Sequence, residues 1–423
     1  MPTKGLFDDL KTRGLIHDST DESALSARLD DSPIGIYVGF DPTADSLHVG
    51  HLMGQLTLRR FQLAGHRPFP LAGGATGMVG DPSGRSDERN LLDRETLEHN
   101  VGNIKKQLEN ILDFGAGPSQ ATLVNNADWT AGITALDFLR DVGKHITVNQ
   151  MMAKESVKNR LNSENGLSYT EFSYMLLQAN DFRHLCAHHG VELQMGGSDQ
   201  WGNITAGIDL IRKTLSRGAF GATWPLVTKS DGTKFGKTAS GAVWLSAERT
   251  SPYQFRQFWM QMADADIVRY LPQYSLAPLQ ETNALIESHV SDPGKRLAQR
   301  SLASEMTTIV HGAQAAADAE SAADILFGGD PVSATAAALQ VVAGEVPTTR
   351  VSPDDLADTF GLLSRSGVVA STSEARRTID QKGLKVNGMT LEKDETLASK
   401  GFLHDRWVLV RKGKTGYHLF DLA

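Results

Sequence analysis

Apolar residues in the first half of the chain occur as short continuous runs that alternate with stretches of helical spacing. The run at 34–39 is typical of a buried strand, and the segment that begins near His48 repeats its apolar residues at helical spacing. Three further short runs are strand candidates: 68–72, 122–124 and 191–194. This alternation predicts a parallel sheet covered by helices, with ligands bound at the carboxyl ends of the strands.

The pattern changes in the second half. It becomes rich in Ala, Leu and Gln and poor in strand-forming residues, which predicts a helical domain. A stretch of Gly, Pro, Ser and Ala follows and is typical of a linker. The last part combines two short amphipathic helical patterns with a hairpin signal, Asn387-Gly388. We expect three domains at 1–228, 247–327 and 353–423, with a connector at 229–246 and a linker at 328–352.

Composition narrows the class of protein. The 423 residues are 40% hydrophobic and 22% charged, which is ordinary for a globular protein and excludes a largely disordered chain. Cys186 is the only cysteine, so an intrachain disulfide and a thiolate zinc site are excluded. No apolar run is long enough to span a bilayer, and the N-terminus lacks the apolar core of a secretory signal. We therefore expect a cytoplasmic protein with no membrane contact and no bound metal.

Charge is distributed unevenly along the chain. The formal net charge of −8 argues against a protein that coats nucleic acid. Residues 365–414, however, hold eleven Lys and Arg against six Asp and Glu. This excess indicates a small basic module near the C-terminus.

The first motif with chemical content is YVGFDPTADSLHVGH at 37–51, where a strand ends, a turn follows and a helix begins. A helix N-terminus offers unpaired N–H groups and the positive end of the dipole, so it binds phosphates. His48 and His51 would add hydrogen-bond donors, and Gly50 would let a flat base approach the backbone. The alternative is a helix whose two histidines only face solvent.

The second motif is Lys234-Phe235-Gly236-Lys237-Thr238, in a segment rich in Ser, Asp, Gly and Thr. Two lysines on such a segment could close on a polyphosphate and neutralise charge that develops during phosphoryl-type chemistry. A solvated basic loop is the alternative.

Three weaker patterns add polar groups. In the Gly-rich string at 73–85, Asp81 could receive an ammonium group. Tyr174, Gln178 and Asp181 share one helical face, which is either a pocket wall or simply the wet side of a helix. Asp199, at a helix start, could bind ribose hydroxyls or only cap the helix.

In combination these motifs resemble a known family. His48-Val49-Gly50-His51 resembles the HIGH signature of class I aminoacyl-tRNA synthetases, and residues 234–238 resemble their KMSKS signature. The strings YVGFDPTADSLHVGH, GGATGMVGDPSG, EFSYMLLQANDF and GGSDQWGN resemble bacterial-type tyrosyl-tRNA synthetases, in the family's order and over essentially the whole chain. Residues 373–388 resemble an S4 RNA-binding domain. The resemblance implies an α/β fold: a Rossmann-like parallel-sheet catalytic domain, an α-helical anticodon-binding domain and a small α+β S4-like domain.

The resemblance also implies residue roles in a tyrosine pocket. Tyr37 and Asp181 match the pair that hydrogen-bonds the phenolic hydroxyl of substrate tyrosine. The groups around its α-ammonium match Asp81, Tyr174 and Gln178. Gln200 matches a residue near the carboxylate.

A second set of positions matches the ATP site: Gly39, Asp41, Thr43, His48, Gly50, His51, Arg85, Arg89, Asp199, Lys234 and Lys237. Within it, Thr43 and His48 match donors to the γ-phosphate, and His51 matches a group at the nucleotide ribose. The family has a mobile clamp that closes on pyrophosphate, and its positions correspond here to Lys234, Lys237 and Thr238, with Arg85 and Arg89. Asp199 matches a ribose contact, whereas Asp41 lies in the pocket without one assigned contact. The catalytic set would be Thr43, His48, His51, Lys234, Lys237 and Thr238.

The implied reaction has two steps. ATP and L-tyrosine give tyrosyl-adenylate and pyrophosphate, and tyrosine is then transferred to the 3′ end of tRNA(Tyr). Mg²⁺ would accompany ATP, no cofactor would stay bound, and the family is homodimeric. RNA contacts would come from Arg376, Arg377, Lys382 and Lys385.

Three other classes of protein are alternatives to a tyrosyl-tRNA synthetase. Tryptophanyl-tRNA synthetases share the class, but the Tyr37/Asp181 pair and the S4-like tail argue against them. A pantothenate-synthetase-like or cytidylyltransferase-like enzyme would lack the helical domain and the tail. A non-catalytic RNA-binding protein on the same scaffold would not need both phosphate motifs.

Overall fold

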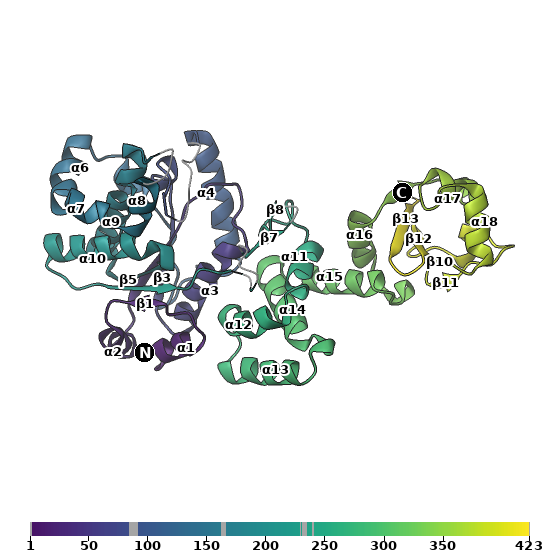
Figure 1. Ribbon diagram of the computed structural model, residues 1–423, viewed down its shortest axis with the longest axis horizontal. Helices are drawn as coiled ribbons and strands as arrows, with labels where there is room; N and C mark the ends of the chain where they lie inside the picture. The colour runs from purple at the N-terminus through teal and green to yellow at the C-terminus, as the bar shows by residue number, and fades with distance from the viewer. Residues whose placement is uncertain are drawn as a thin grey trace. The chain divides into compact units, whose positions relative to one another are not determined.

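The computed structural model describes residues 2–83, 92–161, 166–228, 230, 235–238 and 241–422 (Figure 1). The chain forms two compact units, one made of residues 1–250 and 258–310 and the other of residues 251–257 and 311–423. Within the described ranges, no helix is both long and apolar enough to cross a membrane.

The first unit is built on a six-stranded sheet with the order β1-β6-β5-β2-β3-β4. All neighbours are parallel except β1, which pairs antiparallel with β6. The strands are β1 Asp18–Ser19, β2 Gly35–Phe40, β3 Arg67–Ala72, β4 Val124–Asn125, β5 Val191–Gly197 and β6 Phe220–Trp224. The α/β fold class with a parallel sheet is confirmed.

Helices connect and cover these strands, as Figure 1 shows. Parallel strands buried on both faces form continuous apolar runs, which is why Ile36, Tyr37 and Val38 of β2 are all at most 3% exposed. The helices of this part are α1 Leu6–Thr12, α2 Glu22–Asp31, α3 Val49–Leu63, α4 Arg94–Glu109, α5 Ala127–Thr130, α6 Ala135–Asp141, α7 Val148–Met152, α8 Glu155–Leu161, α9 Tyr169–His189 and α10 Trp201–Leu215.

The helical segment that follows contains α11 Pro252–Met260, α12 Asp264–Tyr274, α13 Leu279–Ser291 and α14 Leu297–His311. Within the first unit, two buried arginines from the N-terminal part of the chain bind the carbonyls at the C-terminal end of α12. Arg13 Nη1 donates to Pro272 O (3.1 Å), and Arg60 Nη2 donates to Gln273 O (3.0 Å). These carbonyls have no partner within the helix, so the guanidinium groups satisfy them and complement the negative end of the helix dipole.

The second unit centres on a five-stranded sheet with the order β11-β10-β12-β13-β9. Side chains alternate along β12, Trp407–Lys412, so that its two faces build two cores. Val408 and Val410 pack with residues of α17 Thr359–Arg365 and α18 Thr372–Asp380. Trp407 and Leu409 pack with residues of α15 Ala313–Leu326 and α16 Ala336–Glu345. The other strands are β9 Thr348–Arg350, β10 Leu384–Val386, β11 Met389–Thr390 and β13 Gly416–Asp421.

Residues 328–352, which the composition predicts as a linker, carry regular structure. They include α16 and β9, and β9 pairs in parallel with β13. The segment is ordered because Leu339 and Val342 are fully buried in the core shared with the sheet. The proposed limits of the domains stay predictions.

Candidate active site

A cavity of about 780 Å³ opens in the first unit where β2 and β5 end and α3 begins. This is the place at which open parallel sheets bind ligands. Thirteen of the residues given individual site roles from the sequence line it: Tyr37, Gly39, Asp41, Thr43, His48, Gly50, His51, Asp81, Tyr174, Gln178, Asp181, Asp199 and Gln200. Positions predicted for tyrosine and positions predicted for ATP therefore line the same cavity.

The lysine motif and the loop after the Gly-rich string are described only in part. Arg85, Arg89 and Lys234 lie outside the described residues. The backbone of Lys237 and Thr238 forms β7, which pairs with β8 Gly241–Ala242, and nothing is described of their side chains. Phe235 and Gly236 line the cavity, so this motif reaches the same site.

The start of α3 is organised by its two histidines. The Gly50 N–H donates to His48 Nδ1 (3.0 Å), and the His48 N–H donates to His51 Nδ1 (3.3 Å), which together form a capping box. The two rings stack with centroids 4.0 Å apart. Since each Nδ1 accepts a backbone N–H, a neutral ring carries its proton on Nε2. In that neutral form, each imidazole has an Nε2–H donor at the wall of the cavity.

Gly50 is required here for a reason that the sequence did not indicate. A Cβ at this position would lie 2.8 Å from Cε1 of His48, so any larger residue would displace that ring. The glycine was expected to make room for a nucleotide base. The structure adds room for the capping imidazole as a second reason, and the room for a base stays a prediction.

Asp181, which is 1% exposed, is one of the most buried polar groups of the site. Trp129 Nε1 donates to its Oδ1 and Asn126 Nδ2 to its Oδ2, both at 2.9 Å. Burial raises the pKa of Asp181 to about 7, against the opposing effect of these two hydrogen bonds. Burial also raises the pKa of neighbouring Tyr37 well above its usual value, with Asp181 adding to the shift. This end of the cavity thus suits a neutral hydrogen-bonding group in an apolar setting.

Asn126 and Trp129 are site residues that the sequence analysis missed. Both follow β4, which pairs with β3, at the carboxyl edge of the sheet. A polar residue directly after a predicted parallel strand is the signal that could have found Asn126.

Asp41, to which no single contact was assigned, joins three segments of the chain. Tyr174 Oη donates to Asp41 Oδ2 and Thr76 Oγ1 donates to Asp41 Oδ1, both at 2.8 Å. Asn126 Nδ2 in turn donates to Thr76 Oγ1 (3.0 Å), which connects Asp41 to the group that holds Asp181. Asp41 thereby fixes the wall between the strand end, the Gly-rich string and α9.

A second hydrogen-bond network also lines the cavity. Gln200 Nε2 donates to Asp81 Oδ2 (2.7 Å), and Asn203 Nδ2 donates to Gln178 Oε1 (3.0 Å) and to Gln200 Oε1 (3.2 Å). Burial raises the pKa of Asp199, and the nearby charge of Asp81 adds to this. Two carboxylates among amides give a site suited to a cationic group and to hydroxyl donors.

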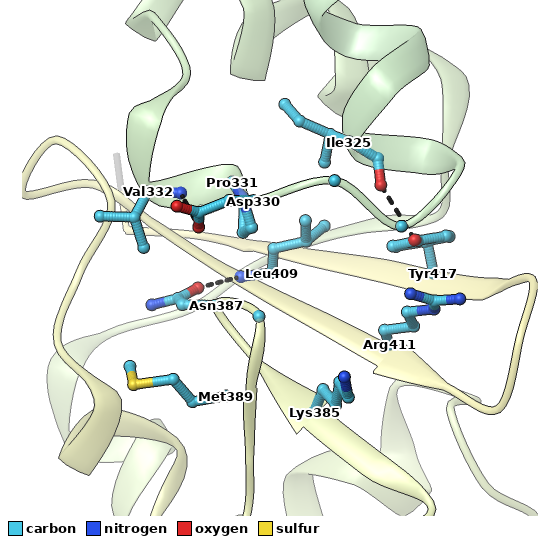
Figure 2. Close-up of a pocket in the computed structure, with 13 residues that line it drawn as sticks. Ile325, Asp330, Pro331, Val332, Lys385, Asn387, Met389, Leu409, Arg411 and Tyr417 are labelled. Atoms are coloured by element: carbon cyan, nitrogen blue, oxygen red, sulfur yellow. Dashed lines mark hydrogen bonds between the residues drawn. The ribbon is translucent and has the colours of Figure 1, made fainter.

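The candidate RNA-binding residues lie in the second unit. Arg376 and Arg377 on α18, Lys382 and Lys385 are all exposed. Lys385 pairs across the sheet with Arg411, and both line a cavity of about 470 Å³ beside the 328–332 segment. Figure 2 shows these two cations on neighbouring strands, with Tyr417 next to Arg411. The second unit thus has exposed positive charge that could contact the phosphates of RNA.

The fold and the histidine-capped helix at the strand ends are those of a class I tRNA synthetase. The family described as "tRNA synthetases class I (W and Y)" matches residues 29–328, and the "Tyrosine--tRNA ligase SYY-like C-terminal domain" matches residues 338–420. The tyrosine–tRNA ligase of Opitutus terrae is 51% identical over 99% of this chain and 100% of its own length. That of Geobacillus stearothermophilus is 48% identical over 99% of this chain and 100% of its own.

A solved structure of a tyrosyl-tRNA synthetase is also similar to this chain. The C-terminally truncated mitochondrial tyrosyl-tRNA synthetase of Aspergillus nidulans aligns with a TM-score of 0.70 and 32% identity, over 77% of this chain and 95% of that chain. The chain belongs to the tyrosyl-tRNA synthetases of class I.

Proposed function

We propose that this chain is a tyrosine–tRNA ligase that activates L-tyrosine with ATP and transfers it to the 3′ end of tRNA(Tyr). The observation that carries this is one cavity with a buried Asp181/Tyr37 end and a histidine-capped helix start. The first end suits a phenolic hydroxyl, and the second suits phosphate groups.

The first step requires no nucleophile from the protein. The carboxylate of tyrosine attacks the α-phosphorus of ATP, the bond to the β-phosphate oxygen breaks, and pyrophosphate leaves with the electron pair. The protein contributes position and electrostatic stabilisation. His48 and His51 would donate Nε2–H groups to the nucleotide, aided by Thr43 and by Lys234, Lys237 and Thr238.

Mg²⁺ would arrive with ATP. This cation prefers phosphate oxygens and retained waters to a cage of protein side chains. The cation would neutralise phosphate charge, while Asp81 and Asp199 would bind the ammonium and the ribose.

Selection of tyrosine would depend on Asp181 and Tyr37. Phenylalanine would leave their buried polar atoms without the substrate hydroxyl, a cost for which tyrosyl-tRNA synthetases are the standard example. Because this rejection occurs at binding, no separate editing site is needed.

The protein would act as a homodimer in the cytoplasm. Six of the fifteen exposed large apolar side chains among the described residues fall between 136 and 169: Leu136, Leu139, Val148, Met152, Leu161 and Tyr169. We call this set the α6–α9 apolar surface. Apolar side chains left exposed along one stretch of the chain support an interface there, and a second copy of the chain is the partner that the family implies.

The test is amino-acid-dependent exchange between ATP and pyrophosphate, measured with each of the twenty amino acids and without tRNA. Exchange with tyrosine alone supports the proposal. Exchange with tryptophan would assign the chain to the neighbouring activity, and exchange with no amino acid would favour a non-catalytic RNA-binding protein.

A further inference from the structure

A short helix, α5, carries Trp129, one of the two hydrogen-bond donors to Asp181. Few contacts within α5 itself fix the position of the Trp129 side chain. α5 has four residues, Ala127–Thr130, none of them buried. Trp129, which donates from Nε1 to Asp181, is only half-buried at the edge of the core cluster around Tyr37 and Phe182. Something other than α5 must fix the plane of its indole.

That contact is His184. Its ring stacks on Trp129 with centroids 4.3 Å apart and planes 12° from parallel. His184 lies on α9 three residues after Asp181, so both side chains emerge from neighbouring positions on one helical face. The indole is therefore held at two points by the same helix, through its N–H by Asp181 and through its face by His184.

We propose that His184 is a positioning residue for the tyrosine pocket, which holds Trp129 in the orientation that keeps its Nε1–H on Asp181. This role rests on the proposed function, because Asp181 is the group assigned to the substrate hydroxyl. His184 contacts no substrate and acts only through Trp129. Burial lowers the pKa of His184 to about 4, with His188 and His189 adding to the shift, so the ring that stacks at neutral pH is uncharged.

The role predicts a specific kinetic signature. Asp181 would bind the phenolic end of tyrosine, far from the reacting carboxylate, so it holds ground state and transition state equally. Loss of its donor should therefore raise KM for tyrosine and leave kcat and the KM for ATP almost unchanged. An aromatic stack of this kind corresponds to about three- to tenfold in KM.

The experiment compares two variants matched in bulk, His184→Leu and His184→Phe, in tyrosine-dependent exchange between ATP and pyrophosphate. We expect His184→Leu to raise the tyrosine KM about three- to tenfold and His184→Phe to stay within about twofold of the parent. His188→Ala is the control, because His188 is exposed and its ring contacts His184, whereas the ring that stacks on Trp129 is that of His184. Thermal unfolding checks that each variant is folded.

A double-mutant cycle with Trp129→Phe separates this role from general packing. Trp129→Phe removes the N–H that reaches Asp181, so His184→Leu should add almost nothing in that background. Additive effects would overturn the proposal, as would a His184→Leu variant that behaves like His188→Ala or loses kcat and both KM values alike. A parent protein that gives no tyrosine-dependent exchange would contradict the proposed function instead.

Discussion

Asp181 is a single residue that both sets the chemistry of the pocket and lowers the stability of the fold. Its carboxyl is fully buried, and two N–H donors offset only part of the burial penalty, so its pKa is raised to about 7. In the unfolded chain the same group ionises near pH 4. The folded state therefore binds a proton on this carboxyl between about pH 4 and pH 7 that the unfolded state releases.

This difference predicts a pH-dependent stability effect of Asp181→Asn. In the parent protein, the free energy of unfolding should fall as pH rises through this window, by up to roughly 1.4 kcal/mol per pH unit. Asn cannot ionise, so the variant should gain stability relative to the parent between pH 5 and pH 8. Thermal unfolding of both proteins at the two pH values measures this, and a difference in Tm independent of pH would contradict it.

Gly73 gives a second prediction for a single residue. A Cβ at Gly73 would lie 2.1 Å from Oδ1 of Asp41 and 2.4 Å from Oγ1 of Thr76. Gly73→Ala should displace the Asp41 carboxylate, cost about 1–3 kcal/mol of stability and raise the KM for tyrosine. Gly102→Ala is the control, because no atom lies within 4 Å of its added Cβ. Gly102 lies on α4, where Ala favours the helix more than Gly does. Gly102→Ala should therefore leave exchange activity unchanged and add about 0.5–1 kcal/mol of stability.

Residue roles could be predicted from the sequence only where a local pattern carries them. Tyr174, Gln178 and Asp181 share a helical face, and the structure places all three on the cavity wall. Asn126 and Trp129 could not be linked to Asp181, because they lie more than fifty residues away along the chain. Such contacts depend on the order of strands in the sheet, and short strands give little signal of that order.

At the scale of an element, the start of α3 combines two functions in one residue. Nδ1 of His48 caps the helix, and its Nε2–H is the donor that we propose for phosphate. The two functions can be separated, because Asn is among the best helix caps but places no donor where Nε2 was.

We therefore predict that His48→Asn keeps the stability of the parent, whereas His48→Ala loses about 1 kcal/mol. Both variants should lower the rate of adenylate formation by about 10²-fold, with tyrosine affinity almost unchanged. Thermal unfolding and single-turnover adenylation provide the two measurements. Recovery of adenylation in His48→Asn would mean that the ring serves only as a cap.

Elements were predictable where apolar runs were long and continuous. The central strands β2, β3 and β5 match the predicted runs to within a few residues. β6 was missed, because its sequence Phe-Gly-Ala-Thr-Trp lacks such a run and the strand forms by pairing with β5. The segment that forms α16 was predicted as a linker because its many small residues are typical of flexible chain. Its Ala, Leu and Val side chains nevertheless complete a core that exists only once the sheet has folded.

At the scale of the whole molecule, the α6–α9 apolar surface is the feature that a single chain leaves unexplained. Leu136 is 79% exposed and Val148 58% exposed, and exposing such side chains to water is unfavourable. If a second copy covers this surface, a carboxylate there would be buried without a partner, which costs several kcal/mol and should prevent association.

We predict that Leu136→Asp combined with Val148→Asp converts a dimer of about twice 45.8 kDa into a monomer of that mass, measured by light scattering during size-exclusion chromatography. Val290→Asp is the matched control, because Val290 is 64% exposed but lies on α13, outside this surface. It should leave the mass of the dimer unchanged. A monomeric parent protein, or a double variant that remains dimeric, would show that these side chains do not form the interface between two copies.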